Sequence, residues 1–254
     1  MYFFLYIFVY IKTQFNNNLF YTMNKTLVFT ATYNEVNNIE NLINKINELD
    51  INLDILIVDD NSPDGTSNLV NNLKKNYSNL FLVTREGKLG LDTAHKFAYE
   101  YAIKKNYSKL ITMDADLSHN PKDIHKIIQL LENSPFVIGS RYIKGGKCEM
   151  NFFRWVLSYF GNKFIKIMLN IKSNEFTTSF RGFDIIGLKN FHLQDVSSKG
   201  YSFFMETIFH INKLGFKIVE LPIIFGERKY GKSKIPKIEI LRTLKNVIIL
   251  KFFK

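Results

Sequence analysis

From residue 26 onward, short apolar segments rich in β-branched residues alternate with longer segments in which apolar residues recur at helical spacing. Strands are predicted for residues 26–32, 53–58, 80–84, 109–113 and 136–139. Helices are predicted between them, among them residues 39–49 and 92–105, and a helix that opens with Asn120 as its N-cap and Pro121 as its first residue. This alternation favours a mostly parallel, Rossmann-like α/β sheet with helices on both faces.

The composition fits a chain with one large α/β domain. Of the 254 residues, 46% are hydrophobic and 22% are charged, which provides a sizeable core. The single cysteine, Cys148, excludes a disulfide framework and any metal site built from several cysteines. The five histidines lack the spacing of metal ligands and are interpreted as structural residues.

Acidic side chains follow two of the predicted strands at the point where each strand ends. Asp59 and Asp60 follow one strand, and Asp114 and Asp116 follow another. Ligands of parallel sheets bind at the carboxyl ends of the strands, so these four carboxylates are expected to converge there. Their mutual repulsion favours a divalent cation, held by one or two carboxylates and by substrate phosphates. No glycine-rich phosphate loop follows the first strand, which disfavours both a dinucleotide-binding site and a P-loop.

The positive charge of the chain is concentrated in its second half. The net charge is +11. Residues 1–138 carry 13 Lys and Arg against 15 Asp and Glu, whereas residues 139–254 carry 21 against 8. This asymmetry favours an anionic partner for the second half, which could be nucleic acid, an anionic membrane or a phosphorylated substrate.

Residues 1–22 are predicted to be an N-terminal extension to the main domain. Residues 1–11 are apolar, but a bilayer span takes about 20 such residues, and the features of a signal peptide are absent from this stretch. We interpret the extension as sequence upstream of a start at Met23, with a short membrane-interface anchor as the alternative. The main domain is expected over residues 23–234, and an amphipathic helix over residues 235–254.

Several sequence blocks follow one another in a recognisable order. They are ATYNE (31–35), IVDDNSPDGT (57–66), MDADLSHNPKDI (113–124), GSRY (139–142), TTSFRGF (177–183), GYSFFME (200–206) and ELPIIFGERKYGKSK (220–234). Together they resemble the family-2 glycosyltransferases with the GT-A fold, and within these the polyprenyl-phosphate (dolichyl-phosphate) mannosyltransferases. The sequence departs from the family pattern at Ala31, Glu175 and Ser179, where Pro, Asp and Gly are usual.

The resemblance implies an inverting transfer of mannose from GDP-mannose to dolichyl or polyprenyl phosphate, which yields lipid-phosphate-mannose and GDP. It implies Mg²⁺ or Mn²⁺ on the donor diphosphate, held by Asp114, Asp116 and Ser118. The implied catalytic residues are Asp116, Arg141 and Arg228. The implied substrate-binding residues are Tyr33, Glu35, Asp59, Asp60, Arg154, Ser158, Arg181 and Lys234.

Two basic stretches rich in apolar residues are predicted to lie at a membrane surface. Residues 151–171 contain the single tryptophan among aromatic and basic residues, and residues 235–254 are apolar with interleaved Lys and Arg. Such helices can lie in the headgroup region, and packing in the core is the alternative. We expect a peripheral protein on the cytoplasmic face of the endoplasmic reticulum in a eukaryote, or of the plasma membrane in a bacterium. Small membrane-anchoring subunits, which some family members need, are candidate partners, and nucleic acid is not expected.

Two alternatives stay open. The same chemistry could transfer glucose or another sugar from a UDP-sugar to polyprenyl phosphate. A non-catalytic basic module that binds membrane or nucleic acid would explain the charge, but it gives no reason for Asp114 and Asp116 at a strand end. Metal-dependent binding of a nucleotide sugar separates the two classes, because the non-catalytic module predicts none.

Overall fold

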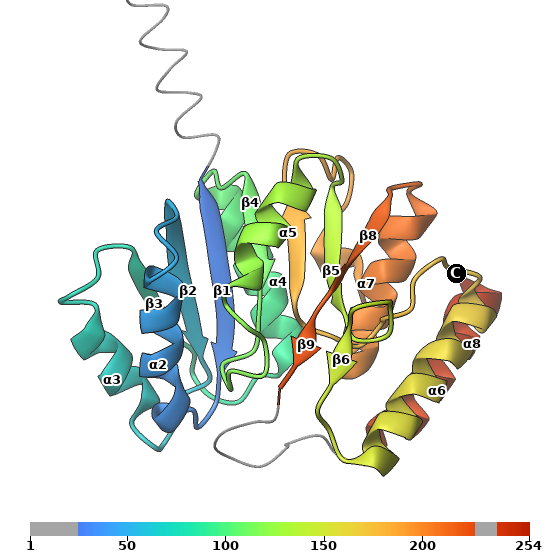
Figure 1. Cartoon of the computed structure of the whole chain (residues 1–254), viewed down its shortest axis with the longest axis horizontal. Helices are drawn as coiled ribbons and strands as arrows, with labels where there is room; N and C mark the ends of the chain where they lie inside the picture. Colours follow the sequence, from blue (N-terminus) through green and yellow to red (C-terminus); the bar gives the residue numbers. More distant parts are fainter. Residues whose placement is uncertain (1–24, 227–237) are drawn as a thin grey trace, which may run out of the picture.

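The computed structural model describes residues 25–226 and 238–254, and a seven-stranded sheet forms its centre (Figure 1). The strand order is β3-β2-β1-β4-β7-β5-β8. The strands are β1 Thr26–Thr32, β2 Leu53–Asp59, β3 Leu80–Thr84, β4 Lys109–Thr112, β5 Phe136–Ser140, β7 Arg181–Asp184 and β8 Ile218–Pro222. Only β7 runs antiparallel to its neighbours β4 and β5. The prediction of a mostly parallel sheet is confirmed.

Helices cover both faces of the sheet, as expected from the alternation of strands and helices. One face carries α2 (Val36–Asn47), α3 (Thr66–Leu73) and α5 (Asp123–Leu131), and the other carries α4 (Leu91–Lys104) and α7 (Tyr201–Lys213) (Figure 1). Strand β1 is buried on both sides: Leu27 and Phe29 pack with the α4 side, and Val28 packs with the α2 side. Such two-sided burial is the reason that central parallel strands are almost continuously apolar.

The predicted start of the helix after β4 is wrong by two residues. Helix α5 begins at Asp123, and Asn120 and Pro121 lie in the turn before it. The Oδ1 atom of Asn120 accepts a hydrogen bond from the backbone N–H of Lys122 at 3.1 Å. Asn120 therefore stabilises a local turn instead of capping the helix, a competing use of the same side chain.

Helices α6 (Phe152–Leu169) and α8 (Ile238–Phe253) lie side by side beyond the β8 edge of the sheet (Figure 1). The side chain of Asn151 caps α6 by accepting a hydrogen bond from the N–H of Phe153. A parallel pair of two-residue strands, β6 (Lys147–Cys148) and β9 (Ile224–Phe225), lies between the sheet and α6. A short 3₁₀ helix, Leu193–Asp195, precedes α7. Within residues 25–226 and 238–254, no helix has both the length and the apolar character needed to cross a membrane.

Arg181 lies in the core between the sheet and α7 and is 1% exposed. Its guanidinium donates to the backbone carbonyls of Thr178 at 2.8 Å, Phe204 at 2.9 Å and Phe176 at 3.3 Å. It also stacks on the ring of Phe204, 4.8 Å from the ring centroid. Through these contacts Arg181 joins β7 to α7. Its guanidinium is therefore engaged within the core and not in the substrate binding that the resemblance implies.

His95 is expected to make the protein less stable as the pH falls below 6.5. Burial, and secondarily the charge of Arg181, lower the pKa of His95 from 6.5 to about 3. Below pH 6.5, His95 is protonated in the unfolded chain but stays neutral in the folded chain. The free energy of unfolding should therefore fall by about 1.4 kcal/mol for each pH unit as the pH is lowered from 6 to 4. Urea unfolding of the protein and of His95→Leu at pH 7 and pH 4.5 checks this. A variant with an unchanged pH dependence would show that other groups cause it.

Candidate active site

The loops that follow β1, β2, β4 and β5 meet at one edge of the sheet, because β1 pairs in parallel with both β2 and β4. A backbone hydrogen bond from the N–H of Asp60 to the carbonyl of Thr32, 3.0 Å long, joins the loop after β2 to the end of β1. This bond places the loop with Asp59 and Asp60 beside the end of β1, while the convergence of these two carboxylates with Asp114 and Asp116 stays a prediction.

Asp59 organises the loop that follows β2. Its Oδ1 accepts from the hydroxyls of Thr32 at 2.7 Å and Ser62 at 2.6 Å. Its Oδ2 accepts from the N–H of Ser62 at 2.8 Å and the hydroxyl of Ser67 at 2.7 Å. The side chain is fully buried, and both of its oxygens are engaged by the protein. The structure thus gives Asp59 a part in the loop, whereas the sequence had given it a direct bond to the nucleoside.

Asp60 forms a buried ion pair with Arg85, which follows β3. Arg85 also donates to Thr93 Oγ1 at 2.6 Å and to the carbonyl of Gly90 at 3.0 Å. Gly90 directly precedes α4 and has a φ of 101°, which favours glycine. The Asp60–Arg85 pair therefore attaches the loop before α4 to the end of β2.

The backbone around Tyr33 and Glu35 is held by the loop after β2. Asn34, with a φ of 58°, donates its N–H to Ser62 Oγ at 2.9 Å, and the N–H of Glu35 donates to Thr66 Oγ1 at 3.0 Å. The ammonium of Lys88 lies 4.5 Å from the centroid of the Tyr33 ring. The half-buried Tyr33 and Glu35 thus sit on a braced loop at the site edge.

Asp114 and Asp116 lie on a strained loop that follows β4. Asp116 is 4% exposed, and its Oδ1 accepts from the N–H and the hydroxyl of Ser118 at 3.0 and 2.6 Å. Leu117 has a φ of 64°, a conformation that a bulky side chain rarely adopts outside functional sites. The side chain of Asp114 is 37% exposed, and its Oδ1 accepts from the hydroxyl of Ser179 at 2.6 Å.

These residues fit a Mg²⁺ or Mn²⁺ ion that is shared with a substrate. Over the described part of the chain, no three His, Cys, Asp or Glu residues gather into a site that protein alone could complete. Mg²⁺ is usually held by one or two carboxylates together with water and substrate phosphates, so Asp114 and Asp116 are a sufficient protein contribution. Ser118, which the resemblance places among the metal ligands, donates its hydroxyl and its N–H to Asp116.

His119 supports the backbone of the Asp114 loop. Its Nδ1 accepts a hydrogen bond from the N–H of Asp114 at 3.1 Å, and its Nε2 lies 3.4 Å from Thr178 Oγ1. The ring stacks on Phe180 with centroids 5.0 Å apart and is 1% exposed. Burial lowers the pKa of His119, although the charges of Asp114 and Asp116 oppose this. The ring is therefore neutral at physiological pH and carries its proton on Nε2.

Arg141, which follows β5, forms a buried bidentate ion pair with Glu175. Both contacts are 2.7 Å long, and a third N–H donates to Thr177 Oγ1 at 2.8 Å. Burial raises the pKa of Glu175, but the charge and hydrogen bonds of Arg141 outweigh this and lower it. The guanidinium also lies 5.1 Å from the ring centroids of Tyr142 and Phe225. Its orientation is thus fixed by charge, hydrogen bonds and stacking.

Arg154 and Ser158 lie on the first half of α6. The hydroxyl of Tyr142 donates to Ser158 Oγ at 2.7 Å, which connects Ser158 to the residue after Arg141. Arg154 is exposed. Arg228 and Lys234 fall outside the described residues.

Residues 226–233, GERKYGKS, fit the spacing of a P-loop, although a P-loop was disfavoured above. A P-loop joins a strand of the central sheet to a helix, with the phosphates at the start of the helix. Here the motif follows β9, which pairs only with β6 within the described residues, and Gly226 is its only described residue. The N–H of Gly226 donates to the carbonyl of Ser118 at 3.0 Å, which attaches Gly226 to the Asp116 loop.

Four supporting residues were not predicted from the sequence: Arg85, His119, Glu175 and Ser179. Glu175 and Ser179 had been noted only as departures from a family pattern, and His119 as a structural residue. His119 had one available signal, since it lies three residues after Asp116 in the same block. Arg85 meets Asp60 because β3 pairs with β2, and no local sequence pattern specifies that pairing.

Comparison with known proteins agrees with this arrangement. Residues 27–190 match the family model described as Glycosyl transferase family 2. An undecaprenyl-phosphate mannosyltransferase of Micrococcus luteus is 32% identical over 212 residues, which cover 83% of this chain and 87% of that protein. A polyprenol monophosphomannose synthase of Mycolicibacterium smegmatis is 33% identical over 214 residues, which cover 83% of this chain and 81% of that protein.

Solved structures share the fold at lower identity. A glucosyl-3-phosphoglycerate synthase of Mycobacterium tuberculosis, in complex with Mn²⁺, UDP and glucosyl-3-phosphoglycerate, has a TM-score of 0.62 and 16% identity over 89% of this chain and 78% of its own. A mannosyltransferase of Pyrobaculum calidifontis, in complex with GDP-Man and Mn²⁺, has a TM-score of 0.54 and 18% identity over 90% of this chain and 70% of its own. The family model and the relatives cover the residues of the site described above. The chain therefore belongs to glycosyl transferase family 2, and it is a glycosyltransferase with the GT-A fold.

Proposed function

We propose that the protein transfers mannose from GDP-mannose to a polyprenyl phosphate such as dolichyl phosphate, with inversion at the anomeric carbon. The products are polyprenyl-phosphate-mannose and GDP. The observation that carries the proposal is the match to two relatives named for mannose and a polyprenyl carrier, each over 83% of this chain. GDP as the nucleotide and Mg²⁺ or Mn²⁺ as the cofactor belong to the proposal.

The donor is assigned to the edge formed by the β1, β2 and β4 loops. Asp114 and Asp116 would hold the metal ion, which when bound offsets the negative charge that grows on the departing diphosphate. Asp114 is the more open of the two carboxylates, while Ser118 fixes Asp116 from the protein side. Tyr33 and Glu35 are proposed to line the pocket of the base and ribose, with Asp60 and Arg85 shaping its wall.

The acceptor phosphate is assigned to the side of the site that faces α6. One of its oxygens forms a bond to the anomeric carbon while the bond from that carbon to the diphosphate breaks. The acceptor is already ionised, so the reaction depends on orientation more than on a strong general base. Arg141, Arg154 and Ser158, together with Arg228 and Lys234, are proposed to bind and orient the phosphates, because guanidinium groups bind phosphate with directed hydrogen bonds.

A peripheral position on the cytoplasmic face of a membrane completes the proposal. The exposed face of α6 is apolar: Phe152 is 68% exposed and Phe153 is 80% exposed. On the neighbouring α8, Leu241, Phe252 and Phe253 are exposed as well. Aromatic and aliphatic side chains on basic helices suit the boundary between headgroups and acyl chains, where a polyprenyl phosphate presents its phosphate.

A transfer assay tests the function directly. Purified protein, Mn²⁺ and polyprenyl phosphate should move radiolabelled mannose from GDP-mannose into the lipid phase, and EDTA should abolish the transfer. Label from UDP-glucose alone would replace the sugar and nucleotide but keep the chemistry. Label from neither donor, with small membrane subunits also supplied, would contradict the proposal.

Asp116→Asn should lower kcat by at least about 100-fold, because it removes a charge that would hold the metal at the developing negative charge. The matched control is Asp195→Asn, an exposed carboxylate on the 3₁₀ helix, which should retain full activity. Circular dichroism should show both variants folded. Comparable activity in Asp116→Asn and the control would remove Asp116 from the metal role.

His119→Leu should weaken Mn²⁺ binding by about tenfold in the presence of GDP, since residues that orient metal ligands usually contribute that much. His119→Asn keeps an acceptor near the Nδ1 position and should restore part of the affinity. Electron paramagnetic resonance of free Mn²⁺ measures both without turnover. Equal losses in the two variants would mean that the ring acts through packing and not through its bond to Asp114.

A further inference from the structure

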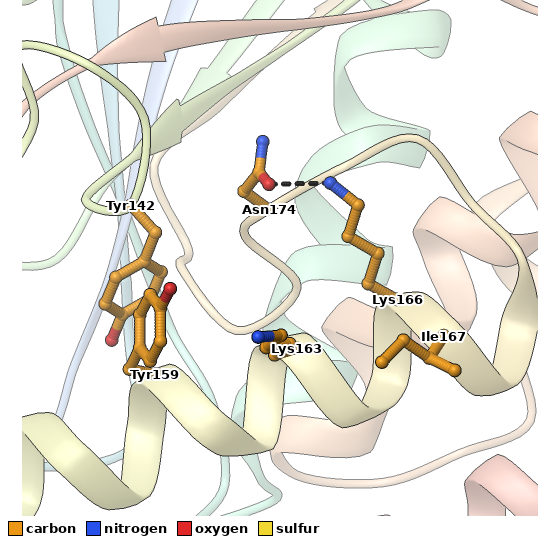
Figure 2. Close-up of a pocket in the computed structure, with 6 residues that line it drawn as sticks. All are labelled: Tyr142, Tyr159, Lys163, Lys166, Ile167 and Asn174. Carbon is orange, nitrogen blue, oxygen red and sulfur yellow. Dashed lines mark hydrogen bonds between the residues drawn. The ribbon is translucent and has the colours of Figure 1, made fainter.

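A cavity of about 240 Å³ lies between α6 and the two loops that carry Arg141 and Glu175. Tyr142, Tyr159, Lys163, Lys166, Ile167 and Asn174 line it. Figure 2 shows that α6 supplies four of these side chains, and that the Tyr142 and Tyr159 rings lie close together at one end. The function proposed above does not use this cavity.

The cavity is positively charged. Lys166 donates to Asn174 Oδ1 at 2.7 Å, as Figure 2 shows, and Asn174 is held in turn by Glu220, which accepts from its side-chain amide at 2.8 Å. Within the described residues, Lys163 has no hydrogen-bond or ion-pair partner. Helix α6 contains Arg154, Lys163 and Lys166 and no acidic residue. An anionic ligand would complete this arrangement.

The acceptor phosphate does not account for these lysines. A polyprenyl monophosphate brings a single phosphate, which is assigned to Arg154 and Ser158 on the first half of α6. Lys163 lies nine residues beyond Arg154 and five beyond Ser158, or about 14 Å and about 7.5 Å further along the helix axis. The two lysines are therefore available to an anionic group other than the acceptor phosphate.

Exposed apolar side chains of α6 continue from the cavity residue Ile167. Phe160 and Phe164 are 59% and 38% exposed on α6, and Ile167, at the cavity rim, is 68% exposed. Two lysines and two tyrosines beside exposed apolar side chains match the boundary at which a phospholipid changes from headgroup to acyl chain.

We propose that this cavity binds the phosphate of an anionic membrane phospholipid, with Lys163 and Lys166 on the phosphate and the acyl chains over Phe160, Phe164 and Ile167. The proposal rests on the lipid acceptor proposed above, which places the protein at a membrane. It adds a lipid that is bound but not consumed, at a site separate from that of the acceptor.

Trp155 provides a direct readout of this binding. It is the single tryptophan of the chain, and it stacks on the cavity residue Tyr159 with ring centroids 5.4 Å apart. Dihexanoyl phosphatidylglycerol, titrated below its critical micelle concentration, should change the Trp155 emission in a saturable way. Dihexanoyl phosphatidylcholine should bind at least about fivefold more weakly. Equal responses to the two lipids would overturn the proposal.

Vesicle binding separates the lysines of the cavity from lysines elsewhere on the molecule. On vesicles of phosphatidylcholine containing one third phosphatidylglycerol, Lys163→Ala/Lys166→Ala should lower the partition coefficient by about 30-fold, the factor for two basic groups at an anionic surface. The matched control, Lys74→Ala/Lys75→Ala, removes the same charge from exposed residues after α3, at the opposite end of the molecule (Figure 1). Equal losses in the two double variants would overturn the proposal.

Transfer to a detergent-solubilised acceptor distinguishes this inference from the proposed function. The lysine variants should keep wild-type kcat there, whereas a loss as large as that on vesicles would place the cavity in the acceptor site and contradict the proposal. The single variant Lys163→Ala changes an exposed side chain, so its effect on phosphatidylglycerol binding cannot come from misfolding. If wild-type protein transfers no sugar but binds the short lipid selectively, the proposed function fails and the lipid site stands.

Discussion

Carboxylates buried at the carboxyl edge of the sheet determine how the surrounding loops are arranged. A buried charge is tolerated only where donors or an opposite charge satisfy it. Asp59 is satisfied by hydroxyls and an N–H group from its own loop and from β1, Asp60 by Arg85, and Glu175 by Arg141. Each pairing joins segments that are distant in the sequence. Loss of one partner would leave a buried charge and release the loop that it holds.

This requirement divides the acidic residues into two groups. Asp59, Asp60 and Glu175 are satisfied by the protein and give the loops their shape. Asp114 keeps a partly exposed carboxylate, which Ser179 orients from one side while His119 fixes the backbone. A side chain that is fixed in position but still open to solvent can meet a ligand without reorganisation. The family resemblance alone implied direct bonds from Asp59 and Asp60 to the nucleoside and metal binding by Asp114 and Asp116.

The sequence was most informative where one physical effect dominates. The strand predicted for residues 26–32 matches β1, because a central strand buried on both faces is continuously apolar. The antiparallel strand β7, Arg181–Asp184, had no such signal, since four residues with a charge at each end do not read as a strand. Arg181 shows the same limit. The sequence block around Arg181 indicated a place in the site. The direction of the Arg181 side chain, however, depends on how β7 pairs in the sheet, and this pairing directs the guanidinium to the backbone of α7.

Helix α6 links the chemistry of the site to its surroundings. Its first half carries Arg154 and Ser158, and Ser158 is connected through Tyr142 to the Arg141–Glu175 pair. Its second half carries the lysines of the cavity, and an exposed apolar stripe runs along its whole length. One rigid helix thus fixes the distance between the reacting groups and the apolar stripe. If that stripe rests at a membrane, the depth of the stripe sets the height of the site above the acyl chains. An acceptor phosphate at the headgroup level would then reach Arg154 without leaving the bilayer.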